Sequence, residues 1–423
     1  MRRIILVLSL LPLLFSQCKK AENKTSLINT DHLNYLFTHL QVEGQPLAGV
    51  VIYAEYPDYR FVEAPGEGLI CVDDIARAAI VYLRYAHYYN DPLALNRARQ
   101  LLHTVLKLQA PNGLFYNFVD GQGNIQKELH NSRPLPNWWA WRAFWSLAEY
   151  LNYIGPNKTG LRDSVHQAIQ KILPHVRQLF DFWKQTQIMA GFEAPLWLPL
   201  HFAADQAGLL LKALCTYYRA APDQEVVPMI RKLASGIMAM QINDARSEFY
   251  GAFLSWQNIW HAYGNIQADA LFDAFEVTGD STYFKAAIKE VDNFYPQLLK
   301  KGLLHEARLL NEQGRVKIIR QRRFEQIAYD LRPMIWATLH AWRLTKSEKF
   351  KQQTITLTSW FAGQNVARKM MYNPENGRCF DGIISEQKIN LNSGAESTIE
   401  ALLALMEVER EKEMKTALKN LWK

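Results

Sequence analysis

A sixfold repeat of long apolar segments and short polar breaks constrains the fold more than any other feature of this sequence. Each apolar-periodic segment is followed by a break of a few residues and then by a second helical segment. The breaks recur at intervals of 58 to 67 residues and are rich in Pro, Gly, Asn and Asp, which end one helix and cap the next. They are marked by Asp91, Lys158, Pro222, Asp280, Ser347 and Arg410. A period of this length holds one helical hairpin and one long loop, so the sequence predicts six helical hairpins.

The two helices of each predicted hairpin differ in composition. The first is apolar and aromatic nearly all round, which is typical of a helix buried on most sides, whereas the second carries more Lys, Arg, Gln and Glu on one side. Six inner and six outer helices predict an all-α fold, an (α/α)6 toroid, with an additional N-terminal helix over residues 31–41. The predicted inner helices cover residues 75–88, 138–151, 202–218, 266–275, 334–344 and 399–406.

The first 30 residues stand apart from this repeat. A charged start, Met1-Arg2-Arg3, precedes the apolar residues 4–15, as in an export signal that is too short to span a bilayer. Residues 1–18 end on Cys18 and resemble a bacterial lipoprotein signal, with Cys18 as the lipidated residue, although Gln17 departs from the small residue usual there. An ordinary cleaved signal peptide is the alternative. We expect export to the bacterial cell envelope, at the periplasm or outer membrane surface, with residues 19–30 as a tether.

The remaining chain reads as one domain over residues 31–423. With 423 residues and 49% hydrophobic content, the chain can bury a large core, and no linker separates two cores. Of four cysteines, Cys18 is assigned to the anchor, and Cys71, Cys215 and Cys379 fit neither a disulfide framework nor a zinc site. We therefore expect buried free thiols, no metal and no cofactor.

Long loops follow each outer helix and lead into the next inner helix, so they gather on one face of the ring. Several contain β-hairpin patterns, such as residues 114–125 around Asp120-Gly121. Long loops inside a compact domain are usually functional. The face that they cover is therefore the candidate cleft.

The last loop residues and first helical turns on that face are rich in carboxylates, indoles and amides. Such side chains suit a sugar site, because rings stack on aromatic faces, hydroxyls need hydrogen-bond partners, and cleavage needs two carboxyl groups. The candidate catalytic residues are Asp73, Asp74 and Glu396. The candidate substrate-binding residues are Trp138, Trp139, Asp205, Trp260, His261, Tyr263, Asp381, Asn390 and Asn392.

Each of these residues also has a structural interpretation. Ser393 and Glu396 have the S-x-x-E spacing of a capping box, and Asp73 can be an N-cap that pairs with Arg77 one turn later. Asp381 before a glycine can form a turn. Most tryptophans at helical spacing belong to a core, and His261 can be a hydrogen-bonded structural histidine.

The early Val72-Asp73-Asp74 and the late segment 392–398 on a six-hairpin plan resemble the six-hairpin glycosidase superfamily, which includes endoglucanases, unsaturated glucuronyl hydrolases and sugar epimerases. Cys379-Phe380-Asp381-Gly382 followed by segment 390–398 is similar to a helical-toroid domain appended to some bacterial glycosyltransferases. The resemblance implies that Asp73 or Asp74 is a base that activates water and that Glu396 is the acid.

We therefore expect a glycoside hydrolase that acts on an oligosaccharide or polysaccharide, and the resemblance implies an inverting mechanism. One alternative is a lyase for an acidic glycan, using His261, Tyr263, Arg332 and the basic residues 315–323. Another is a non-catalytic glycan-binding lipoprotein. Residues 315–323 read as a basic strand or loop, either a solvated face or an attractant for an acidic substrate, and no nucleic-acid module is recognisable. The expected membrane contact is the lipid anchor alone, and the oligomeric state is not predicted.

Overall fold

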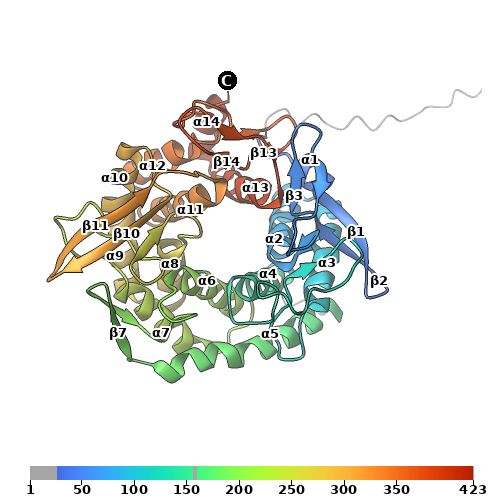
Figure 1. Cartoon of the computed structure of the whole chain (residues 1–423), viewed down its shortest axis with the longest axis horizontal. Helices are drawn as coiled ribbons and strands as arrows, with labels where there is room; N and C mark the ends of the chain where they lie inside the picture. Colours follow the sequence, from blue (N-terminus) through green and yellow to red (C-terminus); the bar gives the residue numbers. More distant parts are fainter. Residues whose placement is uncertain (1–25, 156–159, 423) are drawn as a thin grey trace, which may run out of the picture.

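The computed structural model describes residues 26–155 and 160–422, and within them the helices form a closed ring of hairpins (Figure 1). Each inner helix contacts the next one around the ring, and the last contacts the first. The inner helices of the described chain are α2 (Val72–Tyr89), α4 (Trp138–Ile154), α6 (Ala204–Ala220), α8 (Gln267–Thr278), α11 (Ala328–Thr345) and α13 (Ala395–Glu409). The predicted (α/α)6 toroid is confirmed. The predicted signal over residues 1–18, with Cys18, lies outside the described residues.

The outer helices complete the hairpins. They are α3 (Pro92–Lys107), α5 (Gly160–Leu179), α7 (Val226–Ala239), α9 (Ser281–Lys289), α12 (Glu348–Thr358) and α14 (Lys412–Asn420). After α9 the chain continues through a π-helical turn into α10 (Tyr295–Lys301), and after α5 through a 3-10 turn, Phe180–Phe182. The polar breaks act as caps: Asp91 accepts hydrogen bonds from the Leu93 and Ala94 amides at the start of α3, and Asp280 caps α9.

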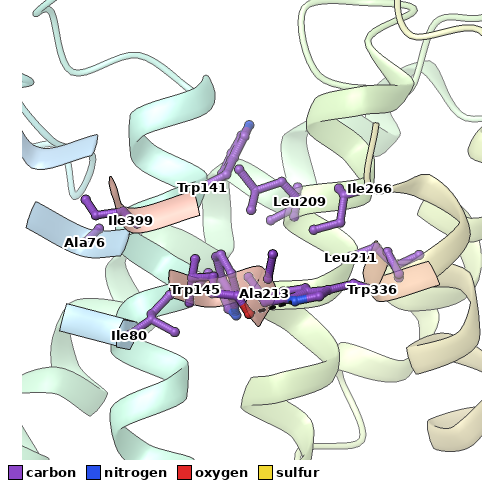
Figure 2. Packing of buried hydrophobic residues seen from close by; sticks show 14 of the residues in the cluster. Ala76, Ile80, Trp141, Trp145, Leu209, Leu211, Ala213, Ile266, Trp336 and Ile399 are labelled. Carbon is purple, nitrogen blue, oxygen red and sulfur yellow. Dashed lines mark hydrogen bonds between the residues drawn. The ribbon is translucent and has the colours of Figure 1, made fainter. Parts of the chain in front are cut away.

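Large apolar side chains fill the middle of the ring (Figure 2). Trp145 of α4 and Trp336 of α11 pack edge to face with ring centroids 5.9 Å apart. Trp141 and Leu209 lie in the same fully buried cluster. This layer separates the face that carries the long loops, here the loop face, from the opposite face, here the far face.

Small antiparallel sheets occupy the long loops, as the sequence predicts. The pairs are β1 (Phe37–Val42) with β2 (Gln45–Val50), β3 (Tyr53–Glu55) with β4 (Arg60–Val62), β5 (Ile70–Cys71) with β6 (Phe118–Val119), β7 (Thr186–Met189) with β8 (Phe192–Pro195), β12 (Tyr372–Asn373) with β13 (Arg378–Cys379), and β14 (Gly382–Ile383) with β15 (Ile389–Asn390). One sheet has three strands, in the order β11 (Arg315–Arg322), β10 (Glu306–Glu312), β9 (Ile259–His261).

Two local predictions need correction. The helix predicted over residues 31–41 ends early: α1 covers Asp31–Leu36, and Phe37 begins β1, where it pairs with Val50. The hairpin predicted over residues 114–125 forms only next to its Asp120 turn, where Val119 bridges Ile125, because Phe118 and Val119 also pair with β5. In both places pairing with another strand overrides the local pattern.

The first described residues lie against the end of the chain. Ser26 Oγ donates to Glu409 Oε2 at 2.6 Å, and the Leu27 amide donates to Glu409 Oε1 at 2.9 Å. The last part of the predicted tether therefore packs on the ring. Cys71, Cys215 and Cys379 are buried and free, as expected. Within the described chain, every helix is too short or too polar to span a bilayer.

Candidate active site

Strand β5 leads directly into α2 and places Asp73 and Asp74, in the first turn of α2, on the loop face. Cys71 is the N-cap of α2, and its Sγ accepts a hydrogen bond from the Asp74 amide at 3.4 Å. Asp73 is therefore not the cap, and its side chain points away from the helix start toward neighbouring helices. Asp73 Oδ2 forms a short contact with Arg142 of α4, and Asp73 Oδ1 is buried without a hydrogen-bond partner.

The start of α13 is built differently from the capping box that its sequence suggests. Gly394 is the N-cap, and Ser393 Oγ donates to the Cys379 carbonyl at 2.8 Å. Asp381 Oδ1 accepts hydrogen bonds from the Gly394 amide at 2.9 Å and from Ser397 Oγ at 2.7 Å. Asp381 thus caps α13 from the preceding loop, and Glu396 is left free of capping duty.

Backbone contacts join the two ends of the chain at this point. The Ser393 amide donates to the Ala54 carbonyl and the Ala395 amide to the Ile52 carbonyl. A Cβ atom on Gly394 would lie 2.5 Å from the Ile52 carbonyl oxygen, so this close approach requires glycine. The segment before α2 is therefore held against the start of α13.

One guanidinium group connects the carboxylates of the two helices. Arg77, whose side chain is 2% exposed, donates through Nη2 to Asp74 Oδ1 at 2.5 Å. Its Nη1 lies 3.1 Å from Glu396 Oε2 and 2.8 Å from Glu400 Oε1. Asp73 Oδ2 is 3.8 Å from Nη2. Acidic residues more than three hundred positions apart thus share one cation.

Two further arginines surround this centre. Arg332 of α11 donates from Nε to Glu400 Oε2 at 2.5 Å, and Arg142 donates from Nη2 to the Tyr329 hydroxyl at 2.6 Å. The guanidinium carbons of Arg77, Arg142 and Arg332 lie 5.5, 5.0 and 5.4 Å from the Tyr329 ring centroid. Three buried cations therefore offset much of the charge of four carboxylates around one aromatic ring.

Burial and pairing act in opposite directions on these carboxyl groups. Burial raises the pKa of Asp74 to about 6, even though Arg77 opposes the shift. Burial also raises the pKa of Asp381, against the hydrogen bonds from Gly394 and Ser397. For Glu400, burial is outweighed by Arg332 and Arg77, so its pKa is lowered. The site thus holds both protonatable and firmly ionised carboxyl groups.

A cleft of about 430 Å³ opens beside this centre. Asp73 and Glu396 are its accessible central acids, with 20% and 44% of their side chains exposed, whereas Asp74 is nearly fully buried. Asp381 and Asn390, both predicted to bind substrate, also line the cleft. Further lining residues are Tyr53, Glu67, Asn117, Glu325 and Tyr329.

The predicted histidine site forms a separate, tightly bonded group. His261 Nε2 lies 3.0 Å from Asp205 Oδ2, and His261 Nδ1 lies 2.7 Å from the Tyr263 carbonyl oxygen. The rings of His261 and Tyr263 stack with centroids 3.7 Å apart. Both imidazole nitrogens have partners within the protein, so neither is free for a substrate.

The predicted aromatic and amide residues lie in different surroundings and have different roles. Trp138 is half-buried beside Arg142, with the guanidinium carbon 5.2 Å from a Trp138 ring centroid. Trp139 donates from Nε1 to the Phe115 carbonyl at 2.8 Å and anchors a loop. In contrast to the expectation, Trp260 is 1% exposed and packs in the core against Phe249 and Phe294. Asn392 accepts a hydrogen bond from the Tyr56 amide and so holds a loop.

Sequence reasoning missed several residues of the site. Glu400 follows Glu396 by four residues, a spacing that places both on one side of α13 and could have indicated it. Tyr329 lies in the first turn of α11, but nothing in the sequence marks its ring as the centre of three arginines. Glu67 and Glu325 reach the cleft from loops whose paths the sequence does not reveal.

The far face holds a second polar cavity, of about 290 Å³. There Lys212 Nζ bonds Asp269 Oδ2 and Asp273 Oδ2, each at 2.7 Å. Burial lowers the pKa of His340, but hydrogen bonds with Asp269 and Glu276 outweigh it and raise the pKa to about 9. We call this set, with Arg84, Arg219, Arg343 and Glu407, the far-face network.

In the described part of the chain, Asp273, Glu276 and His340 form a group with ligand atoms all within 4.8 Å of one another. Both Asp273 oxygens already accept from cations, one from Arg219 and one from Lys212. A protonated His340 has no lone pair for a metal. The group is therefore better suited to internal ion pairs than to metal binding.

No family model matches the chain, and no curated protein matches its sequence. Solved structures with a similar fold include a cellobiose 2-epimerase from Bacillus thermoamylovorans, 17% identical with a TM-score of 0.59, covering 86% of this chain and 92% of that one. A D-mannose isomerase is 13% identical with a TM-score of 0.59 and the same coverages. An α-1,6-mannanase of Salegentibacter is 11% identical with a TM-score of 0.54, covering 85% and 92%. The chain has the six-hairpin (α/α)6 toroid fold of these enzymes.

Proposed function

We propose that the protein is a carbohydrate-active enzyme, a glycoside hydrolase that cleaves an oligosaccharide in the loop-face cleft. One observation carries the proposal: Asp73 from the first inner helix and Glu396 from the last face the same cleft, with Arg77 between them. Glycosidic cleavage needs a pair of carboxyl groups, one to protonate the leaving oxygen and one to act on the opposite side. The mannanase, epimerase and isomerase of the same fold all act on sugars by their names, which agrees with this class.

Asp73 is suited to the role of base. It lies in the first turn of α2, where the helix dipole favours an anion, and Arg142 pairs with its Oδ2. Its side chain lines the cleft and keeps 20% of its surface exposed. A carboxylate that is held in place by an arginine and exposed to the cleft can orient and deprotonate a water molecule.

Glu396 is suited to the role of acid once the substrate is bound. Arg77 Nη1 donates a hydrogen bond to Glu396 Oε2 and fixes the position of the carboxyl group. The Glu396 side chain is 44% exposed and lines the cleft, so it can reach the glycosidic oxygen of a bound sugar. Asp74 acts on Arg77 and not on the sugar, because both of its oxygens are held by Arg77 and the Cys71 thiol. The proposed mechanism is inverting, with water between Asp73 and the anomeric carbon.

Proton-transfer chemistry at His261, as in the lyase alternative, has less support. The Asp205 carboxylate and the Tyr263 carbonyl oxygen occupy the two ring nitrogens. A lyase must also attract an acidic glycan, and the cleft carries six acidic side chains against one arginine, Arg77. We also propose that the reaction takes place outside the cytoplasm, because residues 1–18 resemble an export signal.

The purified protein should be screened against a panel of neutral oligosaccharides, with the products identified. On the substrate found, Asp73→Asn and Glu396→Gln should each lower turnover about 10²- to 10⁴-fold while folding stays intact. Asp163→Asn on the outer helix α5 is the matched control and should keep full activity. Full turnover in both cleft variants would contradict the proposal. Oligosaccharides bound but never cleaved would favour a binding protein, and unsaturated products absorbing in the ultraviolet would favour a lyase.

A further inference from the structure

The hairpin of β10 and β11 projects beyond the circle of helices and takes no part in the proposed reaction (Figure 1). We call residues 306–322 the basic ribbon. β11 is the edge strand of its sheet, and nearly all of its side chains are exposed. Its cations are Arg315, Lys317, Arg320 and Arg322. A local concentration of exposed positive charge on a projecting hairpin is a candidate contact surface.

Two arginines of the ribbon stand directly opposite each other. Arg308 of β10 and Arg320 of β11 are paired in the strand register. Like charges at directly opposed positions destabilise a sheet. The nearby acids are occupied, since Glu306 pairs with Arg322 at 3.1 Å and Glu312 pairs with Lys317. Neither Arg308 nor Arg320 forms an ion pair with any described residue. Binding of an anion would offset this repulsion.

Exposed isoleucines lie between these cations. Ile318 and Ile319 are 37% and 56% exposed, at a bulge where the register shifts beside Arg308 and Leu309. Charged residues on an edge strand alone are explained by protection against edge-to-edge association. That explanation does not account for two exposed isoleucines on the same strand. Apolar side chains surrounded by arginines suit an anionic headgroup layer above an apolar interior.

The acidic charge of the cleft argues against a role of the basic ribbon in attracting the substrate. Glu325 and Asp381 line the cleft together with four other acidic side chains, and Arg77 is its only cationic lining residue among those described. An acidic glycan attracted to the ribbon would therefore be repelled by the cleft. The partner of the ribbon is accordingly distinct from the substrate.

We infer that the basic ribbon is a docking surface for a phospholipid bilayer with anionic headgroups. Guanidinium groups pair with lipid phosphates, and Ile318 and Ile319 enter the headgroup boundary. The ribbon leads directly into α11, whose Tyr329 lines the cleft. Docking would therefore hold the loop face close to the membrane. This inference does not depend on the proposed hydrolase activity.

Flotation of the full chain with lipid vesicles tests the inference. The vesicles contain phosphatidylcholine alone or mixed with phosphatidylglycerol, and the readout is the ratio of affinities for the two kinds. The double variant Arg315→Glu with Arg320→Glu should lower the preference for anionic vesicles about tenfold or more. The substituted side chain at position 320 would face Arg308, whereas the one at position 315 would face Glu312 at the exposed end of the hairpin. Circular dichroism and thermal unfolding should therefore show that the variant is folded before its binding is compared. The preference of the unaltered chain should weaken at about 0.5 M salt.

The matched control changes the same amount of charge elsewhere. Lys171→Glu with Lys285→Glu alters two exposed lysines on the outer helices α5 and α9 and should keep the anionic preference. A third variant, Ile318→Ser with Ile319→Ser, should weaken binding even at high salt, because the apolar contact is not screened. Equal anionic preference in the ribbon and control double variants would overturn the inference. Binding of a soluble acidic polysaccharide through the ribbon without binding to vesicles would also overturn it.

Discussion

The two faces of the ring use the same six helices for different purposes. Glu396 and Glu407 lie at opposite ends of α13, one on each side of the buried apolar layer that contains Trp145 and Trp336. On the far face, Glu407 is 6% exposed and contacts Arg84, Arg343 and the Tyr88 hydroxyl. On the loop face, Glu396 is half-exposed and contacts Arg77 alone among the described cations. The Glu407 carboxylate is therefore enclosed by partners within the protein, whereas the Glu396 carboxylate has one cationic partner and is open to solvent.

The same difference holds for the buried polar atoms. In the described chain, none of the charged side chains of the far-face network has a buried atom without a hydrogen-bond partner. At the loop-face starts of the inner helices, several such atoms lack partners: Asp73 Oδ1, Arg77 Nε, Asn137 Oδ1, Gln206 Oε1, Gln267 Oε1 and Arg332 Nη1. Unpaired buried groups cost stability and are rare in folded proteins. The unpaired polar atoms therefore lower stability at the loop face but not in the far-face network, as expected of a functional site.

The largest expected difference is between the two glutamates of α13. Glu407→Gln should lower the free energy of unfolding by about 3 to 5 kcal/mol, because Arg84 and Arg343 lose a buried partner. Glu396→Gln should cost less than about 1 kcal/mol, because its pairing is exposed to solvent. Urea unfolding of both variants measures the difference. Glu413→Gln, exposed on α14, is the control and should be near neutral. Equal costs for Glu396 and Glu407 would remove the distinction between the faces.

The next effect is a loss of stability at alkaline pH that arises on the far face. The pKa of His340 is raised from 6.5 to about 9, so its protonated form stabilises the folded state. That contribution is complete below pH 6.5 and is lost as the pH rises through about 9, which corresponds to about 3 kcal/mol. His340→Gln should abolish this part of the pH dependence, as measured by urea unfolding across the range. A variant that keeps the full pH dependence would show that another group is responsible.

The smallest effect separates structural from functional residues within the loop face. Trp139→Phe removes the hydrogen bond to the Phe115 carbonyl and should cost about 1 kcal/mol. Because Trp139 does not line the cleft, oligosaccharide affinity should be unchanged when measured by calorimetry. A large loss of affinity would extend the binding surface beyond the cleft residues described above.

The sequence predicted the ring because its signals are local. Polar breaks such as Asp91 and Asp280 cap helices through their own side chains, and the apolar composition of inner helices reflects burial directly. The acidic residues Asp73 and Glu396 were placed on one face because helix starts repeat in phase with the hairpins. These inferences required no knowledge of how the loops fold.

Loop-dependent features were not predictable in the same way. Trp260 is buried because the Phe249 and Phe294 rings enclose it, and the sequence does not show that packing. Ser393 has the spacing of a capping residue, but it bonds the Cys379 carbonyl while Asp381 supplies the cap. The helix predicted over residues 31–41 ends at Leu36 because β2, which begins fourteen positions after the start of the helix, pairs with Phe37–Val42. In each case a contact outside the local sequence pattern decides the role of a residue.

The most direct test is the position of a bound substrate. A crystal structure of the Glu396→Gln variant with the oligosaccharide identified by screening would show where the sugar lies. The account predicts the scissile glycosidic oxygen within hydrogen-bond distance of residue 396, with the sugar ring between it and Asp73. An oligosaccharide in the far-face cavity, or on a surface away from the Arg77 centre, would contradict the assignment of the loop-face cleft as the active site.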